Sequence, residues 1–106
     1  MSDSSSGKVA VIAKIPAKPG QRDDLAAALS TALETAKGER GTIYYILHTD
    51  DKDADVLWMY ELYESQAALG EHMGSEAFKA LGPAIGKFVG GAPELIFTKP
   101  VGGKGL

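Results

Sequence analysis

The apolar and polar residues of the chain form two kinds of pattern, one typical of strands and one typical of helices. Runs rich in β-branched and aromatic residues, bounded by proline, glycine or charge, predict strands at 9–15, 42–49, 55–63 and 94–99. Apolar residues spaced three and four apart predict helices at 21–36, 65–74 and 75–88. The order is β, α, β, β, α, β with the second helical part divided. It predicts an α+β, ferredoxin-like βαββαβ fold with a four-stranded antiparallel sheet and helices on one face.

Charges and caps mark where the helices begin and end. Asp23 and Asp24 fall in the first turn of the first helix, where the helix dipole favours negative charge. Ser65 and Ser75 are expected to cap the next two helices. Pro83 lies inside the last helical pattern, so a kink or a restart is expected near Gly82.

The central hairpin is apolar on both faces. Strand residues alternate sides, yet each side of 42–49 and 55–63 carries mostly apolar or aromatic side chains. A chain of 106 residues can cover one face of its sheet with its own helices and has few elements left for the other. The second face therefore predicts a homodimer that buries sheet against sheet. The expected interface residues are Tyr44, Ile46, Trp58 and Tyr60.

Composition narrows the function classes. The net charge is -3 and no basic stripe occurs, which argues against nucleic acid and anionic membrane surfaces. With no cysteine and two separated histidines, no metal site is expected. The acidic turn at 50–55 lacks the glycine and distal glutamate of a calcium loop. Residues 1–8 and 100–106 are predicted to be flexible tails around a domain at 9–99, and a cytoplasmic location is expected.

Several short motifs occur together in order and resemble the antibiotic biosynthesis monooxygenase domain. They are Gly41-x-x-x-Tyr45-x-Leu47-His48-x-Asp50, Leu57-x-x-x-Glu61-x-Tyr63-x-Ser65, Ala68-Leu69-x-x-His72 and Ser75-x-x-Phe78. The resemblance covers residues 9–99. It implies a dimeric α+β barrel with one pocket per subunit between sheet and helices. It also implies a reaction with O2 that uses no metal, haem or flavin in some members.

The sequence departs from parts of that family. Tyr63 stands where members usually have tryptophan, and Ala13 and Gly82 occupy the places that the haem-degrading branch fills with asparagine and histidine. The similarity is therefore greatest to the quinol-oxidising branch, and no cofactor is expected.

Two titratable residues interrupt the apolar pattern around the hairpin. His72 is expected to point from a short helix toward the strands, where a neutral imidazole can act as a general base. Glu61 lies mid-strand, where an unpaired carboxylate is costly to bury, and is expected to hydrogen-bond His72. Alternatively, His72 fills the helix–sheet junction and Glu61 is a structural carboxylate.

The remaining candidates belong to the same two faces of the hairpin. The expected substrate-binding residues are Tyr45, Tyr63, Phe78 and Met59. Aromatic residues on strands are more often core, which is the alternative for the tyrosines. His48 is expected at the interface or surface.

The resemblance, together with His72 as a candidate base, implies a cofactor-independent monooxygenase that oxidises a small electron-rich aromatic, such as a quinol or an anthrone, with O2. A dimeric small-molecule binding module without turnover is one alternative. A non-oxidative isomerase or decarboxylase that uses the same pocket is another.

Overall fold

A computed structural model describes residues 7–106, so most of the expected N-terminal tail lies outside the described residues. The strands are β1 (Val9–Pro16), β2 (Thr42–Thr49), β3 (Val56–Tyr63) and β4 (Glu94–Thr98). The helices are α1 (Arg22–Lys37), α2 (Gln66–Gly74) and α3 (Glu76–Ile85). The sheet order is β2-β3-β1-β4, and all three pairings are antiparallel. The predicted α+β, ferredoxin-like fold is confirmed.

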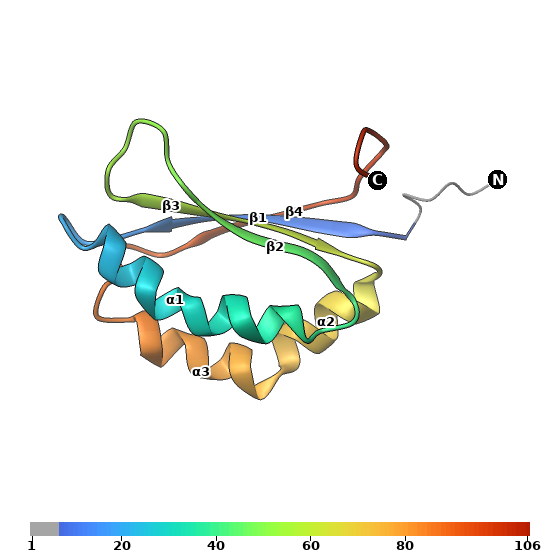
Figure 1. The fold of residues 1–106 in the computed structure, drawn as a ribbon, viewed down its shortest axis with the longest axis horizontal. Coiled ribbons are helices and arrows are strands. Elements are labelled where there is room, and N and C mark those ends of the chain that lie inside the picture. The colour runs from blue at the N-terminus through green and yellow to red at the C-terminus, as the bar shows by residue number, and fades with distance from the viewer. Residues whose placement is uncertain (1–6) are drawn as a thin grey trace.

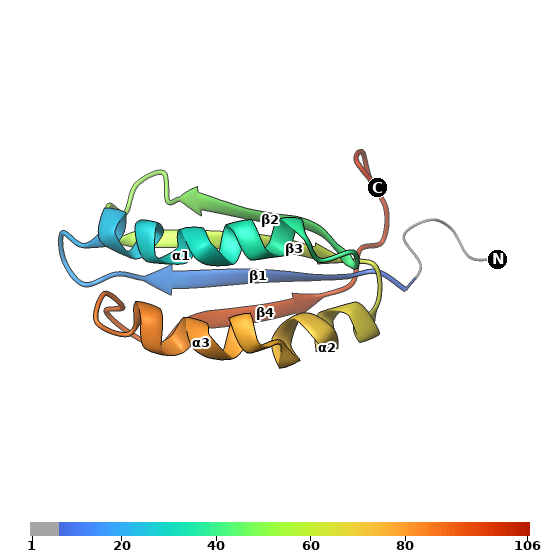
Figure 2. The ribbon, with the colours of Figure 1, turned by 60° about the horizontal axis from the view of Figure 1, so that its bottom comes forward.

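The molecule has two layers, with the three helices on one face of the sheet (Figures 1 and 2). Alternate residues of β1 and β3 face the helices, and their register pairs Val11 with Glu61 and Ala13 with Met59. Apolar residues from the sheet and α1 form the main core: Ala13, Ile15, Leu25, Leu29, Leu57 and Met59. This core fixes which side chains of the sheet point into the interior.

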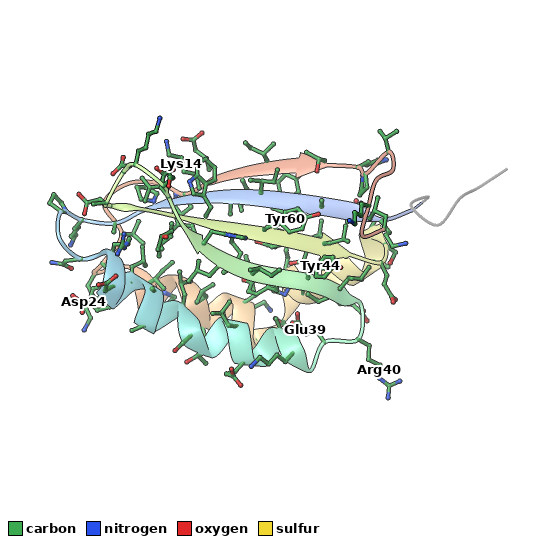
Figure 3. All side chains as sticks on the ribbon, turned by 45° about the horizontal axis from the view of Figure 1, so that its top comes forward. Lys14, Asp24, Glu39, Arg40, Tyr44 and Tyr60 are labelled. Atoms are coloured by element: carbon green, nitrogen blue, oxygen red, sulfur yellow. The ribbon has the colours of Figure 1, made fainter. Side chains whose placement is uncertain are left out.

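The other face of the sheet carries no helix (Figure 1). Figure 3 places Tyr44 and Tyr60 there, with ring centroids 6.4 Å apart. Tyr44 is 39% exposed, Ile46 is 44% exposed and Ile96 is 49% exposed. The predicted interface residues Tyr44, Ile46, Trp58 and Tyr60 thus share one face, which we call the open face. Ile96, which is not among the predicted residues, lies on the same face.

Two serines cap the short helices as predicted. The Ser65 hydroxyl accepts from the Ala68 N–H, and the Ser75 hydroxyl accepts from the Phe78 N–H, both at 3.1 Å. The restart that is one of the two expectations at Pro83 is wrong, because α3 continues through it to Ile85. The preceding residue is Gly82, which has no Cβ to clash with the proline ring, so the helical backbone is tolerated.

Strand β4 pairs with β1 but is poorly covered by helices. Leu95 and Phe97 pair with helix-facing residues of β1, yet they are 46% and 56% exposed. The interior is therefore open along the β4 side. In the part of the chain that the structure describes, no helix has the length and apolarity to cross a membrane.

Candidate active site

A cavity of about 420 Å³ lies between the sheet and the helices. Its wall is mostly apolar, with residues from β1, β2, β3, β4 and all three helices, including Ala13, Leu29, Tyr45, Met59, Phe78, Ile85 and Leu95. Glu61 is the buried charged group in this wall, at 7% exposure. The other charged wall residue, Lys79, is exposed and forms an ion pair with Glu76 at 3.5 Å. The cavity thus suits an apolar ligand that presents one proton donor to a carboxylate.

Glu61 is held by its neighbour on the same strand face. The Tyr63 hydroxyl donates to Glu61 Oε1 at 2.5 Å. Burial raises the pKa of Glu61, while the Tyr63 hydrogen bond and the charge of His72 oppose that shift. Burial and the Glu61 carboxylate also raise the pKa of Tyr63, so its hydroxyl remains a donor. The result is a buried carboxyl group that is more basic than an ordinary one.

His72 lies in the last turn of α2, surrounded by aromatic rings. Its ring centroid is 5.1 Å from Tyr45, 5.3 Å from Tyr63 and 5.3 Å from Phe78. The Ser75 hydroxyl donates to the His72 carbonyl at 2.7 Å and caps α3 just before Phe78. The Ser75 hydroxyl therefore links the backbone of His72 at the end of α2 to the backbone of Phe78 at the start of α3.

The expected hydrogen bond between Glu61 and His72 is wrong. His72 Nδ1 is 2.9 Å from Oε1 of Glu39, and Glu61 is paired with Tyr63 instead. Glu39 lies in the turn between α1 and β2, labelled in Figure 3. The turn brings the Glu39 carboxylate to His72 on α2. Glu61 hydrogen-bonds Tyr63 instead.

The predicted substrate-binding residues divide into two groups. Tyr45, Met59 and Phe78 line the cavity, as does Glu61. Tyr63 is fully buried and His72 lies in a narrow space beside Tyr45 and Phe78, so neither is among the cavity-lining residues. Their catalytic and binding roles remain predictions.

Residues on the open face make structural contacts. The Trp58 indole N–H donates to Asp50 at 2.7 Å, and the Lys14 ammonium lies 5.8 Å from the Trp58 ring centroid. The Asp53 backbone N–H, followed by Trp58, lowers the pKa of Asp50 to about 2. His48 is exposed at the end of β2. Among the described residues, no group of three or more His, Cys, Asp or Glu side chains is placed to hold a metal ion.

Sequence reasoning missed Glu39 and Thr42. The Thr42 hydroxyl donates to Glu39 Oε1 at 2.8 Å, so the same oxygen contacts both Thr42 and His72. The only signal was a carboxylate between Gly38 and Gly41, and a short loop has no periodicity from which its direction can be predicted.

Comparison with known proteins agrees with this architecture. Residues 8–83 match the family described as antibiotic biosynthesis monooxygenase. The chain is 32% identical over 93 residues to "Putative monooxygenase Rv0793" of Mycobacterium tuberculosis, covering 88% of this chain and 83% of that protein.

Solved structures give the same result. The structure of Rv0793 superposes with a TM-score of 0.82 at 28% identity, covering 92% of this chain and 98% of that one. A protein from Caulobacter crescentus CB15, described as a putative antibiotic biosynthesis monooxygenase, superposes with a TM-score of 0.83 at 30% identity. That match covers 91% of this chain and 92% of the other. The chain belongs to the antibiotic biosynthesis monooxygenase family.

Proposed function

We propose that this protein is a monooxygenase that oxidises a small electron-rich aromatic, such as a quinol or an anthrone, with O2 and no cofactor. The observation that carries the proposal is a single buried carboxylate, Glu61, in the wall of an otherwise mostly apolar cavity of about 420 Å³. Family membership supports oxygenase chemistry, and the cavity supports the substrate class.

The chemical difficulty is that O2 is a triplet and reacts slowly with closed-shell molecules. Removal of a proton from an acidic phenol, or from the anthrone CH₂ that lies across the central ring from the carbonyl and is conjugated with it, gives an anion that transfers an electron readily. In this proposal Glu61 accepts that proton, and its raised pKa supports the role because it makes the group a better base than a solvent-exposed carboxylate. The mostly apolar wall lowers the local dielectric constant, which strengthens the interaction of the base with its substrate.

For an anthrone-like substrate the reaction balances as CH₂ plus O2 giving C=O plus water. The carbanion carbon forms a bond to oxygen and yields a peroxide. The remaining C–H bond and the O–O bond of this peroxide then break, which forms C=O and releases water. The cavity residues Tyr45, Met59 and Phe78 would hold the ring system in place.

His72 is proposed as the second acid–base group of the site. When protonated, His72 favours the Glu61 carboxylate electrostatically, and its ring lies against Tyr45 and Phe78 of the cavity wall. His72→Ala is expected to lower turnover by about tenfold or more. Unchanged turnover in this variant would remove His72 from the mechanism.

Oxygen uptake by chelator-treated, colourless protein with a panel of quinols and anthrones tests the proposal. After subtraction of autoxidation, uptake should saturate with substrate and fall by about a hundredfold in Glu61→Gln, which keeps the size of the side chain. Glu64→Gln is the matched control, because Glu64 is exposed just beyond β3. Ligand binding without oxygen uptake contradicts the proposal and supports a binding module, and chemical change without oxygen supports an isomerase.

The open face supports a homodimer as part of the same proposal. Tyr44, Ile46 and Ile96 are each more than a third exposed on a sheet face that no helix covers. A second copy that covers this face would remove apolar side chains from water without altering the helix side, where the cavity lies.

A further inference from the structure

The two ring nitrogens of His72 have different surroundings. Nδ1 lies 2.9 Å from Glu39 Oε1, whereas Nε2 is buried and has no hydrogen-bond partner among the described residues. The side chain is 8% exposed, so solvent is largely excluded from the ring. An unpaired buried polar atom costs free energy and is uncommon in folded proteins. This geometry indicates a role for Nε2 beyond packing.

The contact with Glu39 determines which nitrogen carries the proton. An ionised carboxylate only accepts hydrogen bonds, so Nδ1 must be the donor and Nε2 of the neutral ring keeps its lone pair. The Thr42 hydroxyl donates to the same oxygen of Glu39 at 2.8 Å. A backbone hydrogen bond from Thr42 N–H to the Glu39 carbonyl closes the turn at 3.3 Å. Glu39 is thus held in place from two directions.

We propose that Glu39 is a positioning residue that fixes His72 in the Nδ1–H tautomer and leaves Nε2 as a proton acceptor among the Tyr45, Tyr63 and Phe78 rings. Glu39 acts through its contact with His72 Nδ1, so it is a positioning residue and not a group that touches the substrate. Its side chain is 21% exposed, so its carboxylate stays partly hydrated while the ring it holds is buried. The effect on turnover rests on the proposed function, whereas the tautomer does not.

Imidazole ¹⁵N NMR measures the tautomer directly. The chain has two histidines, so a His48→Gln variant assigns the His72 signals. At a pH where both rings are neutral, wild-type His72 should show a protonated Nδ1 and a bare Nε2. Glu39→Gln should keep this tautomer because the amide oxygen still accepts, and Glu39→Ala should lose it. A protonated Nε2 in the wild type, or the same tautomer in Glu39→Ala, overturns the proposal.

Kinetics then separate positioning from mere folding. Glu39→Ala should lower kcat by about tenfold with little change in KM, and Glu39→Gln should retain most of the activity. Thr42→Val leaves the Glu39 carboxylate but removes one of its hydrogen-bond donors. Its kcat should lie between those of Glu39→Ala and Glu39→Gln. A changed tautomer with unchanged kcat overturns the positioning role. If the wild type oxidises no compound of the panel, the proposed function fails, and NMR alone still decides the role of Glu39.

Discussion

Glu61 and Tyr63 form a buried hydrogen-bonded pair at the cavity. Burial dominates over the Tyr63 hydrogen bond and the His72 charge, so the pKa of Glu61 lies above its ordinary value of 4.5. A carboxylate in this state holds its proton to higher pH in the folded protein than in the unfolded chain. Stability and activity should therefore both depend on pH through this one residue.

The stability prediction compares wild type with Glu61→Gln across pH. In the window that begins near pH 4.5 and ends at the raised pKa, the folded state binds more protons than the unfolded state. The free energy of unfolding contributed by Glu61 therefore falls as pH rises through this window and is constant above it. Urea titrations should show wild type losing stability relative to Glu61→Gln as pH increases. If the difference in unfolding free energy between the two proteins does not change with pH, or if wild type gains stability relative to Glu61→Gln as pH increases, the raised pKa is contradicted.

Tyr63→Phe removes the donor that partly stabilises the Glu61 anion. The pKa of Glu61 should rise further, and the acid limb of the kcat/KM profile should move to higher pH. Stability should fall by about 1–3 kcal/mol, because a buried acceptor loses its partner. Tyr60→Phe on the open face serves as the control. An unshifted acid limb in Tyr63→Phe would show that Glu61 does not control the profile.

At the residue scale, the sequence identified the titratable groups but not their partners. Glu61 and His72 stand out because they interrupt an apolar pattern, and strand alternation places Glu61, Tyr45 and Tyr63 on one face. Which carboxylate meets His72 depends on the direction of the turn at 38–41, which periodicity does not encode. The pairing of Glu61 with its neighbour Tyr63 rather than with His72 follows from that arrangement.

At the scale of the elements, the loop after α3 passes so close to the end of β1 that Gly90 has no room for a side chain. A Cβ at Gly90 would lie 2.5 Å from the Ala17 carbonyl oxygen, and Gly90 N–H donates to the Pro16 carbonyl at 2.9 Å. The segment after α3 is thereby joined to the end of β1. This contact sets how the chain enters β4 beside the cavity.

Gly90→Ala should destabilise the protein by about 1–3 kcal/mol, because the new methyl group meets backbone rather than a movable side chain. Gly70→Ala is the matched control, since its Cβ would meet nothing within 4 Å on α2. It should stabilise by roughly 0.5–1 kcal/mol through lower chain entropy in the unfolded state. Urea midpoints measure both, and equal effects would contradict the packing described here.

Element order and type could be predicted, and one helix detail could not. Periodicity and serine caps located every strand and helix to within a few residues. Pro83 suggested a kink or a restart because a proline lacks the N–H that a helix interior needs. Because Gly82 precedes it and has no Cβ, the helical backbone is tolerated and α3 continues, a steric outcome that helix propensity does not encode.

For the whole molecule, the open face predicts the oligomeric state. Sedimentation should show a dimer for the wild type and a shift toward monomer in Ile46→Asp, which places a charge among exposed apolar side chains. Ala27→Asp, on the exposed side of α1, should leave the state unchanged. A monomeric wild type at micromolar concentration would contradict the dimer.

Anaerobic substrate binding tests the central claim, that Glu61 removes a proton from the substrate before oxygen reacts. A phenol or anthrone whose anion has a distinct absorption band is titrated with protein in the absence of O2. Wild type should produce the anion band, Glu61→Gln should bind the compound without it, and admission of O2 should then consume the band only in wild type. Equal anion bands in both proteins, or oxidation without a detectable role for Glu61, would contradict the account.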